Sequence, residues 1–114
     1  MRKYLLAATF LAILLAVPLV IIAGGSWYSG GSLHKATVGQ WKTASYDNKL
    51  ATAADWAVTH PTVKSKVQKG GSMETLRPFA VQLMLCVDEA AAGKGYDSTS
   101  VAQLAASCVI LMGW

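Results

Sequence analysis

The sequence is short of charged residues, cysteine, histidine and proline, and these shortages exclude several classes of protein. Only 14% of its 114 residues are charged, and it holds two cysteines, two histidines and three prolines. A structural metal site needs three or four ligands at suitable spacing, which this inventory does not provide. The cysteine–x–x–cysteine–histidine motif that attaches haem is also absent. We therefore expect no metal and no cofactor.

The sequence also lacks a convincing set of catalytic residues. Nucleophilic catalysis requires a nucleophile, a base in reach of it and a group that orients the base. His34 lies in a stretch rich in glycine and serine and His60 precedes a proline, and nothing pairs either with a carboxylate. Asp88 and Glu89 are adjacent, so we interpret them as solvated charges on a helix surface. We predict that the protein is not an enzyme and has no small-molecule substrate.

Basic residues outnumber acidic ones, but they are not concentrated. Ten Lys and Arg against six Asp and Glu give a formal net charge of +4. A nucleic-acid-binding surface needs clustered basic residues. The densest cluster, Lys64, Lys66 and Lys69, is interpreted as a solvated loop or helix end, with contact to anionic lipid or an acidic partner as the alternative. We expect no nucleic-acid partner.

Residues 4–23 form an uncharged, mostly apolar run behind Arg2 and Lys3. A basic start, an apolar core and then small residues are the order of a secretory signal. The run is also about 20 residues long, which is the length that a helix needs to cross a bilayer. The segment 1–25 is therefore predicted to be an uncleaved signal anchor, which we favour, or a cleaved signal peptide.

Both interpretations place residues 30–114 outside the cytoplasm. Basic residues before an apolar segment keep that end in the cytoplasm. An anchor would hold the protein in the inner membrane of a bacterial-type envelope with its C-terminal domain in the periplasm, whereas cleavage would release it into the periplasm. Trp27 and Tyr28 directly follow the run, where aromatic residues sit at a membrane interface, so we expect them to contact the membrane or a partner.

The exported part is predicted to contain a linker and one small domain. Residues 26–34 are rich in glycine and serine, which is typical of a flexible linker. The domain at 35–114 is small enough that additional stabilisation matters. In an oxidising compartment Cys86 and Cys108 are expected to form a disulfide, which stabilises the fold by about 3 kcal/mol for a loop of about 20 residues. Two buried free thiols are the alternative.

The spacing of apolar residues predicts a long first helix in the domain, from Lys35 to Thr59. Its stripe consists of Val38, Trp41, Ala44, Leu50, Ala53, Ala54 and Ala57. The His60–Pro61 pair is expected to end this helix, because the residue before a proline is pushed out of the helical region. Residues 61–72 are basic and polar and end in glycines, so we predict a loop there.

A second helix is predicted from Met73 or Leu76 to Ala92, with Ser72 or Thr75 as its cap. This helix is apolar over most of its girth, and such a helix is either buried on several sides or docks on a partner.

A third helix is predicted from Ser98 or Ser100 to Met112, where Ser100 and Gln103 have the spacing of a capping box. A connection of about five residues makes the last two helices antiparallel neighbours. The expected fold is all-α: a signal or anchor helix, then a three-helix domain that contains a helical hairpin. Trp114 follows the last helix and either folds back onto the domain or contacts a membrane or partner.

One stretch resembles a known family. The residues Leu50-Ala51-Thr52-Ala53-Ala54-Asp55-Trp56 are similar to the Thr-Cys-x-Asp-Phe opening of HdeA-type periplasmic acid-stress proteins, and the later order of Leu76, Ala80, Leu83, Cys86 and Cys108 is similar in outline. The family's first cysteine position is Ala53 here. Members are small, exported, helical and disulfide-bonded, and they bind unfolding clients through apolar surface that acid exposes. The resemblance implies such a chaperone as an alternative function.

The sequence as a whole favours an interaction module. An apolar N-terminal segment, a linker and an apolar helix are the features expected of an accessory subunit of a membrane-associated complex. We expect contact with the membrane through residues 4–23 and with a protein partner or a second copy of the chain.

Overall fold

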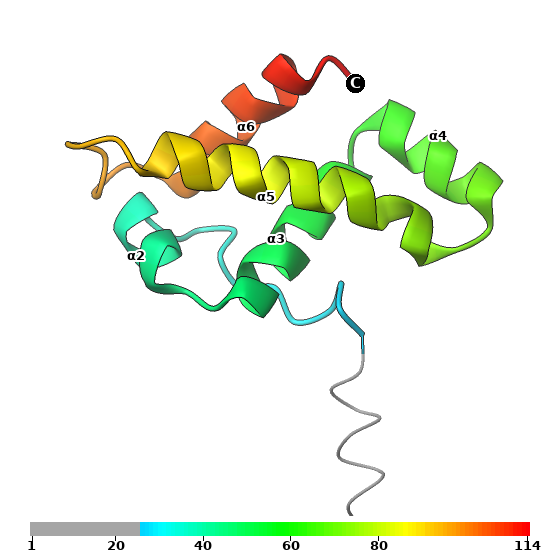
Figure 1. Ribbon diagram of the computed structural model, residues 1–114, viewed down its shortest axis with the longest axis horizontal. Coiled ribbons are helices and arrows are strands. Elements are labelled where there is room, and N and C mark those ends of the chain that lie inside the picture. Colours follow the sequence, from blue (N-terminus) through cyan, green and yellow to red (C-terminus); the bar gives the residue numbers. More distant parts are fainter. Residues whose placement is uncertain (1–25) are drawn as a thin grey trace, which may run out of the picture.

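The computed structural model describes residues 26–114, which form packed helices and no strand (Figure 1). The all-helical prediction is confirmed. The predicted anchor or signal segment at 1–25 lies outside the described residues. Among the helices of 26–114, none is both long and apolar enough to span a bilayer. The helices in chain order are α2 (Val38–Thr43), α3 (Tyr46–Val58), α4 (Pro61–Gly70), the 3-10 helix η1 (Met73–Leu76), α5 (Arg77–Ala91) and α6 (Val101–Met112).

The predicted long helix at 35–59 is wrong, because the chain breaks it into α2 and α3. Ala44 ends α2 in extended conformation, and the Ser45 side chain then accepts a hydrogen bond from the backbone of Asn48 as the cap of α3. Thr37 caps α2 in the same way and forms a reciprocal capping box with Gln40. Serine and threonine caps compete with helix continuation, since they offer the backbone a local alternative partner.

The predicted loop at 61–72 is also wrong, because residues 61–70 form helix α4. Pro61 begins this helix, and proline suits the first helical position since its missing N–H has no partner there in any case. The His60 side chain caps the helix by accepting a hydrogen bond from the backbone of Thr62. Gly71 ends the helix with a φ of 69°, the left-handed conformation that glycine adopts without strain.

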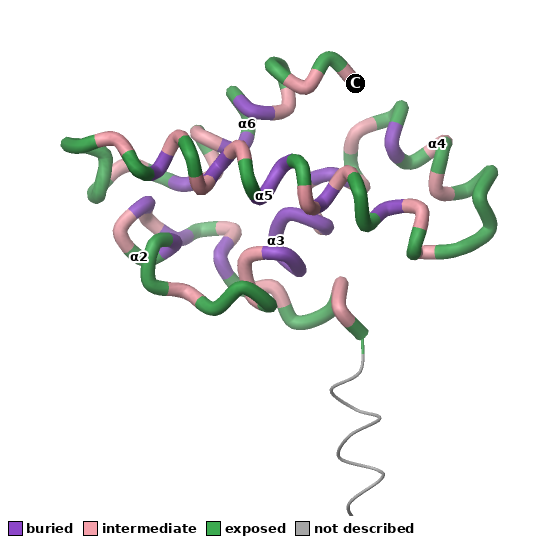
Figure 2. Tube along the Cα trace, in the orientation of Figure 1, coloured by how far each residue is buried: buried purple, intermediate pink, exposed green. Residues whose placement is uncertain are grey.

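Helix α5 is the central element of the domain. Its start differs in detail from the prediction, since Ser72 caps η1 and Leu76 precedes α5 without a side-chain cap. The helix packs against α2, α3 and α6, and Figure 2 shows buried positions along much of its length. Its fully enclosed residues are Ala80, Leu83, Met84, Val87 and Ala91. Of the two predicted roles for this apolar helix, burial on several sides therefore applies.

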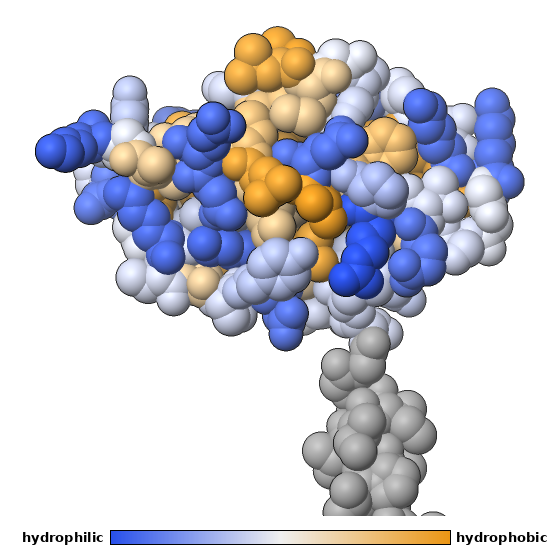
Figure 3. Space-filling model, viewed as in Figure 1, coloured by the Kyte–Doolittle hydropathy of each residue, from blue (hydrophilic) through white to orange (hydrophobic). Residues whose placement is uncertain are grey.

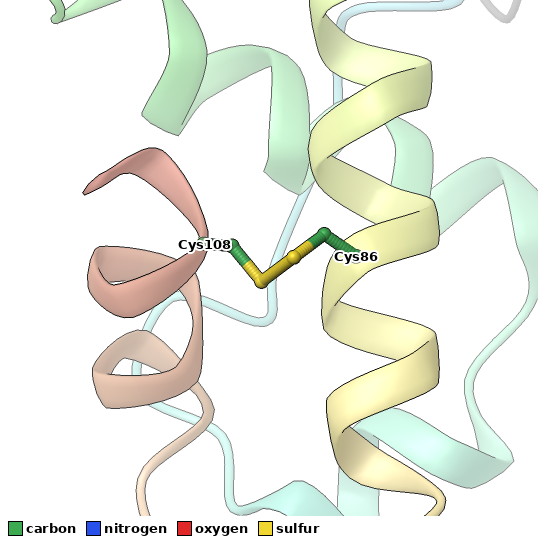
Figure 4. The surroundings of a disulfide bond; sticks show 2 residues. All are labelled: Cys86 and Cys108. Carbon is green, nitrogen blue, oxygen red and sulfur yellow. A yellow bond between two sulfur atoms is a disulfide. The ribbon is translucent and has the colours of Figure 1, made fainter. Parts of the chain in front are cut away.

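Helices α5 and α6 form the predicted hairpin, and a disulfide joins them. In Figure 4 the side chains of Cys86 on α5 and Cys108 on α6 meet between the two helices, with Cα atoms 5.9 Å apart. The predicted capping box at Ser100 is wrong, because its side chain makes no cap hydrogen bond. The start of α6 is instead held by the backbone of Val101, whose N–H donates to the Ala36 carbonyl at 3.0 Å.

Residues 26–34 have no helix or strand, as expected of a linker, but their last part is held against α3. The backbone N–H of Ser32 donates to Asn48 at 2.9 Å, and that of Leu33 donates to Thr52 at 3.2 Å. Leu33 is buried in the core. Trp27 and Tyr28 at the start of the segment also pack against the core, so the segment is attached near both of its ends.

Replacing Gly31 with alanine is expected to destabilise this attachment. An added Cβ would lie 2.6 Å from the backbone nitrogen of Thr52, and backbone atoms of a buried helix cannot move aside cheaply. Overpacking of this kind costs about 1–3 kcal/mol. Thermal unfolding should show a lower midpoint for Gly31→Ala than for Ser29→Ala, an exposed control in the same segment. Equal midpoints would contradict the close approach.

Candidate interaction surface

Large aliphatic side chains remain exposed at two places on the described domain. Ile110 and Leu111 at the end of α6 are 79% and 77% exposed, and Leu85 on α5 is 55% exposed. Figure 3 shows hydrophobic surface at the top of the molecule, where α6 ends, and a second area over the middle of α5. The sequence directed attention to the apolar second helix, but the strongest exposure lies on the last one.

A groove runs beside the exposed end of α6. It lies between α6 and the corner where α3 passes into α4, and its volume is about 570 Å³. One wall comes from α6 and the other from the α3–α4 corner. The residues that line it are Trp56, Thr59, His60, Pro61, Ala102, Ala105, Ala106, Val109 and Ile110. None of these carries a carboxylate or an ammonium group, so the groove is largely apolar.

The local sequence explains why this space stays open. Alanines at 102, 105 and 106 give α6 a shallow wall, since a methyl group cannot reach across to the neighbouring corner. The turn at His60 and Pro61 directs α4 away from the end of α3. Helix α6 has no charged residue in its sequence VAQLAASCVILM, so its exposed face is uncharged, and the part that lines the groove is apolar.

The apolar groove meets a basic surface at Pro61. A shallow hollow lined by Pro61, Thr62, Ser65, Lys66 and Lys69 shares that proline with the groove. Lys64, the third member of the predicted basic cluster, is also exposed on α4. The sequence places this cluster in a solvated loop or helix end, and the structure places it on a helix beside the groove.

None of these three lysines has a carboxylate partner in the described part of the chain. Helix α4 contains no acidic residue. The salt bridges among residues 26–114 pair Asp55 with His34, Asp97 with Lys42 and Asp88 with Lys49. The basic side of the groove therefore keeps an uncompensated positive charge.

Trp114 folds back onto the domain at the end of the groove. Its ring lies edge-on to Phe79 and to His60, with ring centroids 5.4 Å and 5.8 Å apart. The sequence leaves open whether Trp114 folds back onto the domain or contacts a membrane or partner. In the described chain Trp114 folds back. The side chain stays partly exposed, so contact with a partner or membrane remains a prediction.

Trp27 and Tyr28 also pack against the domain rather than extending from it. The Trp27 indole N–H donates to Glu74 at 2.9 Å, and Arg77 lies over its ring at 5.3 Å from the centroid. Tyr28 meets the Trp27 ring edge-on. Both side chains are partly exposed, and their predicted membrane contact is untested.

Asp88 has a structural role that the sequence analysis missed. Its Oδ1 accepts hydrogen bonds from the buried Trp41 indole at 2.8 Å and from Lys49 at 3.1 Å, so it joins α2, α3 and α5. Helical spacing was the available signal, since position 88 falls one turn after Met84 and one turn before Ala91, both buried. Asp88 is a partly exposed charge, as predicted, but its bonds to Trp41 and Lys49 were not part of the prediction.

The polar groups of the described residues do not converge on a reaction centre. His34 binds Asp55 at 2.8 Å on a partly exposed surface, and His60 serves as a helix cap. Within residues 26–114 no three His, Cys, Asp or Glu side chains lie close enough to hold a metal ion.

No protein-family model matches the chain, and no curated protein or solved structure is significantly similar to it. The function of the groove is therefore argued from its own geometry.

Proposed function

We propose that the protein is a non-enzymatic envelope protein that acts as an interaction module or accessory subunit of a membrane-associated complex. The observation that supports it best is the apolar groove beside Ile110 and Leu111. Covering one large aliphatic side chain is worth about 1.5–3 kcal/mol, so leaving two of them in water favours a binding role. Residues 4–23 would anchor the chain in the inner membrane, with the domain in the periplasm.

The packing of the domain core does not explain why Ile110 and Leu111 are apolar. Among residues 26–114, no buried side-chain nitrogen or oxygen lacks a hydrogen-bond partner. The core is closed by Trp41, Leu50, Leu76 and Leu83, each at most 2% exposed. The fold is complete without Ile110 and Leu111, so their apolar character serves something outside the domain.

The position of the chain ends favours a protein partner over the anchoring membrane. In Figure 1 the first described residues lie at the bottom and the C-terminus lies at the top, just after the end of α6. The point at which a preceding segment joins the domain therefore lies on the opposite side from the end of α6. The disulfide agrees with this location, since such bonds persist in oxidising compartments such as the periplasm.

The test is membrane fractionation of the natively expressed protein, followed by intact mass and gentle detergent extraction. We expect the full-length mass in the membrane fraction and a native assembly larger than one chain. A mass that begins near Ser26 in the soluble fraction would remove the anchor. A full-length chain that extracts as a monomer without partners would contradict the interaction module.

A soluble periplasmic chaperone that opens in acid is the second candidate, and one observation favours it. Carboxylates join separate elements: Glu74 holds Trp27, Asp55 holds His34, and Asp88 holds Trp41. Hydrogen bonds that an ionised carboxylate accepts are stronger than those to a neutral acceptor, so contacts of this kind are the ones that acid can weaken. The test is client aggregation and near-ultraviolet circular dichroism at about pH 2–3. A domain that stays closed there and leaves client aggregation unchanged would end this proposal.

A further inference from the structure

We infer that the groove beside α6 binds an apolar helix of a protein partner, and that this helix carries Asp or Glu residues at the end that faces Lys66 and Lys69. The inference rests on the proposed function, because it names the partner chemistry of the same interaction module. Two contiguous surfaces carry it: the neutral apolar groove and the basic hollow that meets it at Pro61.

The apolar surface has the spacing of a helix-binding face. Ala102, Ala106 and Ile110 lie four residues apart on α6 and line the same groove. They span two turns, or about 12 Å along the helix axis. Two alanines followed by a projecting isoleucine let a second helix approach closely and then lock against one larger side chain. Such a helix would bury apolar residues at three- and four-residue spacing.

The basic surface beside the groove favours a partner helix that carries acidic residues at one end. Lys66 and Lys69 are exposed, and no carboxylate of residues 26–114 forms an ion pair with either. Neither α4 nor α6 contains an acidic residue. A partner helix whose apolar part fills the groove would place its end beside these ammonium groups. Carboxylates there are attracted, and lysines would be repelled.

The same charges disfavour a second copy of this chain. The side chains of an α6 helix from another copy would bring no carboxylate to Lys66 and Lys69, since its sequence has no Asp or Glu. The copy would also carry its own exposed lysines into the interface. A bilayer fits poorly for a different reason, because a flat surface cannot fill a concave groove of about 570 Å³.

The experiment is photocross-linking from the groove in cells that make the protein. Ile110→p-benzoylphenylalanine places the probe at the exposed rim, and Gln103→p-benzoylphenylalanine is the control, since Gln103 is exposed on α6 outside the groove. Mass spectrometry then identifies the cross-linked peptide. We expect a segment of another protein from position 110 only, with helical apolar spacing and with Asp or Glu within two turns of the cross-link.

Charge reversal tests the acidic end. The double variant Lys66→Glu/Lys69→Glu should lower the cross-link yield by about tenfold. Replacing the partner's acidic residues with lysine should then restore the yield. Lys94→Glu is the matched control, since Lys94 is exposed on the α5–α6 connection and lines neither the groove nor the basic hollow. Lys66 also lies over the Phe79 ring at 5.5 Å, so Lys69→Glu alone provides a variant that spares this contact.

The outcomes separate this inference from the proposed function. A cross-link to a second copy, to lipid or to a segment without acidic residues overturns the inference, as does a yield that charge reversal leaves unchanged. If position 110 gives no adduct while the protein still extracts in a larger assembly, the groove is not the interface and the interaction module stands. If the protein is also monomeric, both fail.

Discussion

Replacing Trp41 with alanine is expected to destabilise the domain by about 3–5 kcal/mol, the usual cost of truncating a buried tryptophan. Trp41 is fully buried, stacks on Trp56 with ring centroids 5.9 Å apart and donates to Asp88. A small domain has little more stability than this to lose. We therefore expect Trp41→Ala to be largely unfolded, as measured by urea unfolding followed with far-ultraviolet circular dichroism.

Two matched variants separate the contributions of Trp41. Trp41→Phe keeps an aromatic ring but loses the N–H and part of the indole, so it should cost more than the about 1–2 kcal/mol of the donor lost to Asp88 and less than Trp41→Ala. Tyr46→Ala removes an aromatic side chain that is 56% exposed and should change stability by less than about 0.5 kcal/mol. A Trp41→Ala variant no less stable than Tyr46→Ala would contradict the packing described for α2.

Removing the disulfide is expected to destabilise the domain by about 3 kcal/mol, because Cys86 and Cys108 close a loop of 22 residues that otherwise gains freedom on unfolding. The measurement compares the unfolding midpoint of the oxidised protein with that of the double variant Cys86→Ser/Cys108→Ser. The effect concerns the groove as well as stability, since the bond ties the wall formed by α6 to the central helix α5.

Reductant provides the control for the disulfide. It should lower the midpoint of the unaltered protein and leave that of the double serine variant unchanged. Two thiols that react with an alkylating reagent in the unreduced native protein would show that the bond is absent in the cell. That result would also remove the support that the disulfide gives to a periplasmic location.

Sequence pattern was sufficient for the elements with the strongest apolar signal. The second and third predicted helices correspond to α5 and α6, and the predicted disulfide joins them. These predictions succeed because both helices bury apolar residues at helical spacing over three turns or more. Their caps were predicted less well, since a cap depends on local backbone geometry that nearby tertiary contacts also determine.

The errors concern segments in which one residue can indicate either the end of a helix or the start of the next one. The preceding helix ends before His60 and Pro61 as predicted, but Pro61 also begins α4, because proline is excluded from helix interiors and favoured at the first position. Ser45 was placed inside a helix and caps a new one. Helix α4 has only Val63 and Val67 on its packed side, too few for its pattern to stand out.

The groove was beyond prediction from the sequence for a related reason. It is formed by residues that belong to different elements, Trp56 and Pro61 on one side and Ala106 on the other. Its basic neighbour depends on the direction of α4, which was not predicted as a helix. The lysine cluster was identified from the sequence, with an acidic partner as one alternative. The sequence pattern does not show that this cluster lies beside an apolar surface.

The measurement that tests the central claim most directly is the native mass of the full chain, extracted gently from its own membranes, for three forms of the protein. Ala106→Glu places a charge in the groove, and Ser107→Glu places the same charge on the next exposed residue of α6, outside it. We predict that the unaltered protein and Ser107→Glu extract in the same larger assembly, and that Ala106→Glu extracts as a folded single chain. An Ala106→Glu variant that remains in the assembly would contradict a partner-binding groove.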